Sequence, residues 1–162
     1  MYRIGDFMIP TFLQDTLVSE FKEVLSIYKL KNTLDEMVSL NIYPQFLPAK
    51  KEDDDVDHFP YLIISLQDGE DPSEMDSATC KIIFIIGCYD DADNYQGFKD
   101  VLNVIDKINK HLMEKRVFEN QYRVVHPISW SINEEDTYPF YFGGLETNWE
   151  IAKITQMEDE HV

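Results

Sequence analysis

The chain has 162 residues, of which 14 are Lys or Arg and 31 are Asp or Glu, so its formal net charge is −17 at pH 7. This length is typical of one domain with its own hydrophobic core, and a hydrophobic content of 44% excludes an acidic disordered chain. The excess of acid argues against sequence-specific nucleic-acid binding and against membrane binding, since both need a basic surface. We therefore expect a single domain over residues 1–162, with its core from about 10 to 155, an acidic loop at 50–58 and an acidic C-terminal tail at 156–162.

No stretch of the sequence predicts a signal peptide or a membrane span. Asp6 and Pro10 interrupt the N-terminal apolar residues before they reach the 7 to 15 that a signal peptide needs. The longest apolar stretch, residues 82–89, is far shorter than the ~20 residues that cross a bilayer. We expect a soluble protein that is made and used in a cytoplasm.

The two cysteines, Cys80 and Cys88, lie on what we interpret as one strand. At ~3.3 Å per residue their Cα atoms would be ~26 Å apart, whereas a disulfide needs less than ~7 Å. The sequence therefore predicts two reduced, buried thiols without a metal or redox role.

The first half of the chain predicts one helix followed by strands. From Pro10, apolar residues recur every three or four positions, which is typical of an amphipathic helix; they are Leu13, Leu17, Phe21, Val24 and Tyr28, flanked by Val18 and Leu25. The pattern Thr33-Leu34-Asp35-Glu36 resembles a capping box, and predicts either a short second helical piece through Leu40 or a continuation of the first helix. Residues 41–48 predict a short strand, whose prolines place it at a sheet edge.

Residues 59–66 and 80–89 are two apolar segments that could pair as a hairpin with a long acidic loop at 67–79. Because both are apolar on successive residues, we expect both faces of each strand to be covered. Asp93 could cap a second long helix, with an apolar face formed by Phe98, Val101, Leu102, Ile105, Ile108 and Leu112.

Strict alternation predicts a half-exposed strand after this helix. Its apolar positions are Tyr122, Val124, His126, Ile128, Trp130 and Ile132; His126, on this face, is interpreted as a core or interface residue. An aromatic loop at 138–142 and Gly143-Gly144 precede a last strand at 145–151. The order is helix, three strands, helix, two strands, which predicts an α+β fold with two main helices packed on a mainly antiparallel β-sheet.

Catalytic, cofactor and metal patterns were sought, and none is predicted. There is no glycine-rich phosphate loop and no GxSxG, and the four histidines are scattered without metal-ligand spacing. The acidic groups Asp53 to Asp55 and Asp90 to Asp93 could bind Ca²⁺ or Mg²⁺, but we interpret the first as a solvated loop and the second as a strand end and a helix cap. The sequence thus predicts a protein that is not an enzyme.

Three local patterns, together with the order of elements, resemble the tail terminator (tail completion) proteins of long-tailed bacteriophages and the related prophage neck proteins. They are PYLII at 60–64, IIGCYDD at 85–91 continuing through NYQGFKDV at 94–101, and YPFYFGG at 138–144. The similarity extends from about residue 12 to 154. The acidic segments at 50–57 and 156–162 are not part of the pattern.

The resemblance implies a structural assembly protein of the virion, assembled in the host bacterial cytoplasm. It implies a homo-oligomeric ring, usually a hexamer, which caps the tail tube and meets the head-completion (stopper) protein, so that the partners are other copies, the tail-tube protein and the stopper. For the interface we expect three aromatic residues, which could equally fill the subunit core, and the acids of the 67–79 loop; they are Tyr141, Phe142, Trp149, Asp68, Glu70, Asp71, Glu74 and Asp76.

A second group of acids, Asp53, Asp54, Asp55 and Asp57, could face the lumen of such a ring and repel passing DNA, or could only keep the ring soluble. The alternative function is an acidic inhibitor or DNA mimic that binds a basic nuclease or DNA-binding protein. Against it, the acids cluster in loops, whereas a mimic needs carboxylates at ~6 to 7 Å intervals along one face of a helix or strand.

Overall fold

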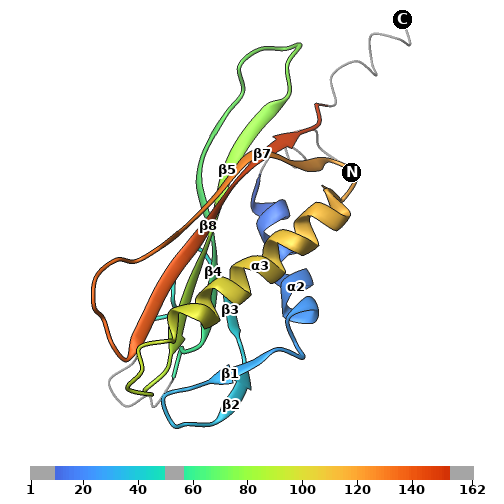
Figure 1. Cartoon of the computed structure of the whole chain (residues 1–162). Helices are drawn as coiled ribbons and strands as arrows, with labels where there is room; N and C mark the ends of the chain where they lie inside the picture. Colours follow the sequence, from blue (N-terminus) through green and yellow to red (C-terminus); the bar gives the residue numbers. More distant parts are fainter. Residues whose placement is uncertain (1–9, 50–56, 154–162) are drawn as a thin grey trace, which may run out of the picture.

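A six-stranded sheet with two helices on one of its faces forms the body of the protein (Figure 1). The structure is a computed structural model that describes residues 10–49 and 57–153. Strands lie in the order β3-β4-β5-β8-β7-β6, and all neighbours are antiparallel except the parallel pair β3 and β4. The strands are β3 (Asn41–Pro44), β4 (Tyr61–Glu70), β5 (Ala78–Tyr89), β6 (Val117–Phe118), β7 (Tyr122–Ile132) and β8 (Phe140–Ile151). This confirms the predicted α+β class and the edge position of the short strand after residue 40.

The helices α2 (Pro10–Val24) and α3 (Phe98–Lys115) cover one face of the sheet because each carries an apolar stripe at helical spacing. α2 contacts β3 and β4, and α3 contacts β5, β7 and β8. The buried residues of the two stripes are Leu13, Leu17 and Phe21 on α2, and Val101, Val104, Ile105, Ile108 and Leu112 on α3. Leu25, and not Val24, continues the α2 stripe, since Val24 is 37% exposed.

Glu20 on α2 joins the two helices. Its carboxylate oxygens lie 2.5 Å from His111 Nε2 and 2.5 Å from Lys115 Nζ on α3. Burial raises the pKa of Glu20, but the hydrogen bonds from these two side chains outweigh burial and hold the pKa below its ordinary value.

The predicted helical piece at Thr33–Glu36 is wrong, because this segment is the turn of a hairpin between β1 (Lys29–Lys31) and β2 (Met37–Ser39). Asn32 stabilises the turn: its Oδ1 accepts hydrogen bonds from the N–H groups of Leu34 and Glu36, both at 2.9 Å. Asp35 has φ 61°, a left-handed conformation that ends any helical run.

Three predicted boundaries also change. α3 begins after Gly97 without a side-chain cap, so Asp93 does not cap it; Tyr95, with φ 56°, interrupts the chain between them. β4 extends through Glu70, which shortens the predicted acidic loop to residues 71–77. The last strand, β8, starts at Phe140, so most of the predicted aromatic loop is strand.

The sheet face opposite the helices is partly open. At the start of β4, residues 61–65 are all buried, as expected for a strand covered on both faces. β5 instead alternates over most of its length, and Ile83 and Ile85 on the open face are half-buried. Cys80 and Cys88 face the helices as free, buried thiols, and burial raises the pKa of both, to about 11 for Cys80.

Candidate interaction surface

β7 has an unpaired edge over residues 128–132, which we call the β7 edge. β6 pairs only with Tyr122 and Arg123, and among the described residues no other strand lies on that side. Asn133 N–H donates to Phe142 O of β8 at 3.0 Å, and antiparallel strands alternate between residues that bond inward and outward. The backbone N–H and C=O groups of Ile128, Trp130 and Ile132 therefore point away from the sheet.

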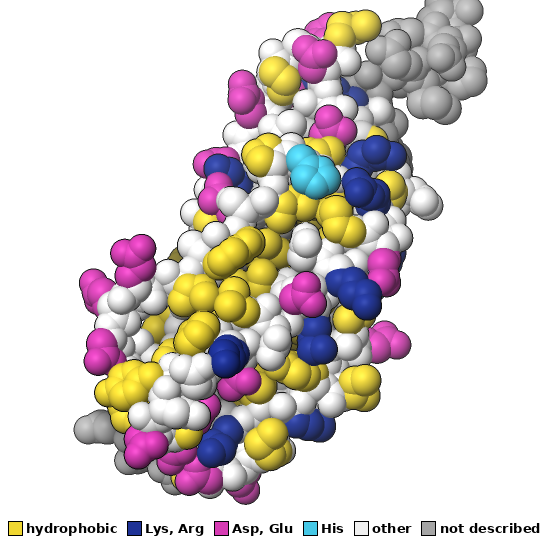
Figure 2. Space-filling view, in the orientation of Figure 1, with side chains coloured by type: hydrophobic (Ala, Val, Ile, Leu, Met, Phe, Trp, Pro, Cys, Tyr) yellow, Lys and Arg dark blue, Asp and Glu magenta, His cyan; other side chains and the backbone are white. Residues whose placement is uncertain are grey.

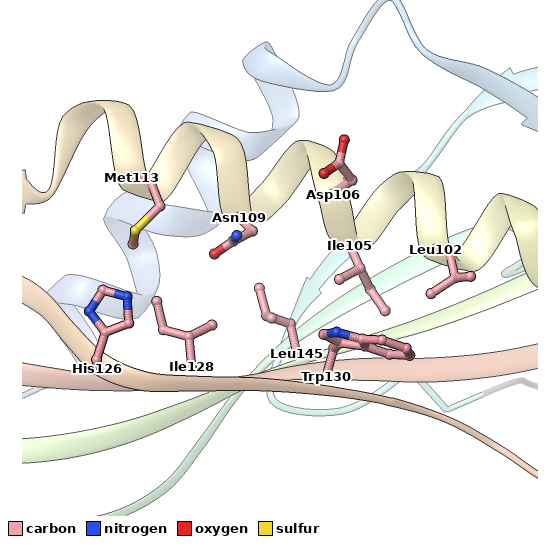
Figure 3. A pocket seen from close by; sticks show the side chains of 9 residues that line it. All are labelled: Leu102, Ile105, Asp106, Asn109, Met113, His126, Ile128, Trp130 and Leu145. Atoms are coloured by element: carbon pink, nitrogen blue, oxygen red, sulfur yellow. The ribbon is translucent and has the colours of Figure 1, made fainter.

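An apolar groove of about 460 Å³ lies between α3 and β7, directly beside this edge. Figure 3 shows the two rows of side chains facing one another across it, those of α3 above and those of β7 below. The lining residues are Leu102, Ile105, Asp106, Asn109, Met113, His126, Ile128, Trp130 and Leu145. In the space-filling view, apolar side chains form a band along this face, with Lys and Arg side chains beside a histidine at its upper end (Figure 2).

The groove forms because the row of apolar side chains on β7 is longer than the part of this strand that α3 covers. Tyr122 and Val124 are buried under the helices, but Trp130, on the same face of the strand, is 62% exposed. Between them the register of β7 against β8 shifts, from Val125 to Ser129. The predicted strand is confirmed over Tyr122–Ile132, but its burial alternates only at its start, and His126 is exposed at the groove and is not a core residue.

Asn109 places an unsatisfied polar atom in the groove. Its Oδ1 is buried and accepts no hydrogen bond from the described residues. Buried polar atoms are nearly always paired, and an unpaired one costs about 1 to 3 kcal/mol. Replacing Asn109 by an apolar side chain of similar size would remove that cost.

The predicted acidic residues form the free end of the β4–β5 hairpin, which projects beyond the helices (Figure 1). Asp68 and Glu70 lie on β4, and Asp71, Glu74 and Asp76 lie in the loop that follows; all five are exposed. Met75, between these acids, is 83% exposed. Lys153 forms an ion pair with Asp71 and donates to Ser73 O.

Two of the three predicted aromatic residues lie far from this acidic end. Ala78 pairs with Ile151 and Tyr89 with Phe140, so Tyr141 and Phe142 lie at the opposite end of the sheet. Tyr141 packs against the backbone of Gly97, and the ring of Phe142 lies 6.0 Å from that of Phe59.

Trp149 is wholly buried, and its Nε1 donates to Thr147 Oγ1 at 2.9 Å. It belongs to the core, which is the second of the two roles expected for these aromatics, and it offers no surface to a neighbour.

Of the predicted lumen acids, Asp53, Asp54 and Asp55 lie outside the described residues. Asp57 accepts hydrogen bonds from Thr33 N at 2.7 Å, Thr33 Oγ1 at 2.5 Å and Phe59 N at 3.0 Å. Its carboxylate therefore links the β1–β2 turn to the segment that leads into β4.

Over residues 10–49 and 57–153, the structure brings together no group of three or more His, Cys, Asp or Glu side chains that could hold a metal ion. Within the same residues, no helix is long and apolar enough to cross a membrane. The arrangement at the groove is one of apolar contact and backbone pairing, which are the means by which proteins bind other polypeptides.

No protein-family model and no curated protein matches this chain. Among solved structures, one chain whose name describes no function aligns with 88% of this chain and 97% of its own, at 13% sequence identity and a TM-score of 0.43. Similarity at this level carries no argument about fold or function, so the surface is interpreted from its own geometry.

Proposed function

We propose that the protein is a non-enzymatic phage assembly protein, a tail terminator or neck component whose copies form a ring. The ring, expected to be a hexamer, caps the tail tube and joins it to the head-completion protein in the virion. The sequence patterns at 60–64, 85–101 and 138–144 support this proposal, as does the α+β fold.

The observation that carries the proposal is the β7 edge beside the α3–β7 groove. An exposed strand edge with apolar side chains is a template for pairing with another chain, and proteins that stay monomeric protect such edges. Here the β7 edge presents the unpaired backbone of three apolar residues, of which Trp130 is 62% exposed. A ring covers that surface on every copy.

Light scattering on the purified protein, alone and mixed with tail-tube protein, tests the proposal. We expect either a ring of several times 19.1 kDa or a monomer that assembles at the ends of tubes, where electron microscopy should show a terminal ring. A monomer that neither binds tubes nor limits their length would refute the proposal.

One observation favours the alternative of an acidic inhibitor. Asp68 and Glu70 both lie on β4, two residues apart, a spacing of ~6.8 Å in an antiparallel strand that is close to the phosphate spacing of a nucleic acid. Two carboxylates do not make a row, and the remaining acids of the hairpin lie in its loop. Binding to a panel of basic nucleases, without ring formation, would favour this alternative.

A further inference from the structure

The sheet has a second free edge, on the side opposite β7. β3 pairs with β4 only as far as Ile64, and the side chain of Gln45 satisfies the next outward residue: Leu66 N–H donates to Gln45 Oε1 and Gln45 Nε2 donates to Leu66 O, both at 2.9 Å. Beyond Leu66, the described residues place no strand against the outer side of residues 67–70, which we call the β4 edge.

The two edges run in compatible directions for a ring. Three antiparallel steps, β4 to β5, β5 to β8 and β8 to β7, separate them, so β4 is antiparallel to β7. In a cyclic ring all copies point the same way along the axis, so the β4 edge of one copy meets the β7 edge of the next as an antiparallel pair.

The charges beside the two edges are also complementary. Four acids, Glu70, Asp71, Glu74 and Asp76, surround the exposed Met75 at the end of the β4–β5 hairpin, and we call this group the acidic tip. Met113 and His126 mark one end of the α3–β7 groove (Figure 3). Met113 lies in the last turn of α3, and Arg116 is the residue that directly follows this helix.

Arg116 and His126 form no ion pair or side-chain hydrogen bond with the described residues. Lys110, one turn before Met113, lines a different pocket with Tyr28 on the flank of α3 that faces α2, and is not part of the groove. On its own chain, the acidic tip has an ion pair only from Lys153, among the residues that the structure describes.

We infer that copies of this chain join head to tail, with the β4 edge and acidic tip of one copy docked on the β7 edge and α3–β7 groove of the next. The antiparallel direction brings the tip to the end of the groove at which Arg116 and His126 lie, and Met75 enters the groove. The inference rests on the proposed ring and names the two surfaces that build it. Because these surfaces differ, the contact is heterologous, which is the kind that closes into rings.

Charge reversal tests the pairing of the surfaces. The tip variant Glu70→Lys/Glu74→Lys and the groove variant Arg116→Glu/His126→Glu change only exposed side chains, so both should fold and give a native circular dichroism spectrum. The tip variant places two lysines beside Asp71 and Asp76 and loses the net negative charge of the tip, and the groove variant sets acids against the acidic tip, so we expect the self-association of each variant alone to weaken by about tenfold or more. In an equimolar mixture, the tip of each variant meets the groove of the other variant, so that opposite charges face one another again. The mixture should therefore recover the wild-type mass by light scattering.

Directed disulfides test the same contact by covalent capture. The double variant Asp68→Cys/Ser131→Cys places one thiol on each edge, while the native thiols are buried. Under mild oxidation it should form a ladder of linked copies that ends at the ring size, and each single variant should form none. A variant with Trp130→Pro loses an outward N–H that the monomer does not use, and should assemble more weakly than the matched Trp130→Ala.

The outcomes separate the inference from the proposed function. If the wild type forms rings, and both charge variants keep the wild-type mass or the double cysteine variant forms no ladder, the head-to-tail contact is wrong and the ring stands. If the mixture recovers the mass and the ladder forms, the contact is supported. If the wild type never assembles, even with tail-tube protein, the proposed function itself fails.

Discussion

Replacing Asn109 by Leu should stabilise the monomer. The buried Oδ1 of Asn109 accepts no hydrogen bond from the described residues, and removing such an atom recovers about 1 to 3 kcal/mol. Leu is also the better helix former by a few tenths of a kcal/mol. Unfolding entropies of ~2.1 cal/mol/K per residue give about 0.34 kcal/mol/K for 162 residues, so Tm should rise by about 3 to 9 °C.

Differential scanning calorimetry measures this change, at a concentration where light scattering shows monomers. Asn109→Ala should raise Tm less than Asn109→Leu, because it removes the amide but leaves the groove emptier. Asn109→Asp is the opposed control and should lower Tm, since it puts a charge in place of a neutral buried atom.

The reasoning is refuted if Asn109→Leu leaves Tm unchanged or lowers it while Asn109→Asp is tolerated.

Three further predictions concern the body of the fold. Cys80 and Cys88 should not react with a thiol reagent at pH 8 until the protein unfolds, since burial raises the pKa of Cys80 to about 11 and that of Cys88 further; stoichiometric labelling of the native protein would contradict this. Glu20→Gln should lower the free energy of unfolding by about 1 kcal/mol at pH 7, as measured by urea denaturation. Because the folded-state pKa of Glu20 lies below its ordinary value of 4.5, this cost should persist above that pH and vanish as the pH falls through the folded-state pKa; a cost independent of pH would exclude the ionic explanation. Gly87→Ala places a Cβ 2.4 Å from two ring atoms of Tyr61 and should cost about 1 to 3 kcal/mol, but much less in a Tyr61→Leu background; equal costs in both backgrounds would show that the strain lies elsewhere.

Periodicity alone predicted the elements whose burial is uniform along their length. The stripe of α3 is the clearest example, since it repeats over several turns; β7 is a strand as predicted, but its burial changes along its length. Local polar patterns were less informative: the capping-box pattern at 33–36 is equally compatible with a turn, and Asn32, just before it, decides for the turn by accepting two backbone hydrogen bonds.

The candidate surface could not be predicted in the same way, because an edge is a property of strand order. Trp130 and Trp149 both lie on apolar faces of alternating strands, yet one is 62% exposed and the other 0%. The difference depends on where α3 crosses the sheet, which no local pattern records. The one available signal was that the apolar alternation of β7 continues to Ile132, farther than a single helix covers.

The two register shifts of the sheet lie at the same position along the strand direction. They form a line of irregular pairing across the sheet, which we call the crease. Twelve consecutive pairs join β5 to β8 without a shift, but the strands outside this pair are irregular where Lys81 pairs with Asn148. There, β4 shifts between Leu66 and Asp68, and β7 shifts between Val125 and Ser129. Strands bend most readily at such irregularities.

Met75, in the loop at the end of the hairpin, lies six residues from Lys81, which is at most about 20 Å. A rotation of ~10° at the crease moves that end by up to about 3 to 4 Å, enough to make or break a hydrogen bond. A small bend of the sheet therefore displaces the acidic tip while every helix and strand stays intact, and in the proposed ring it would open or close the contact between copies.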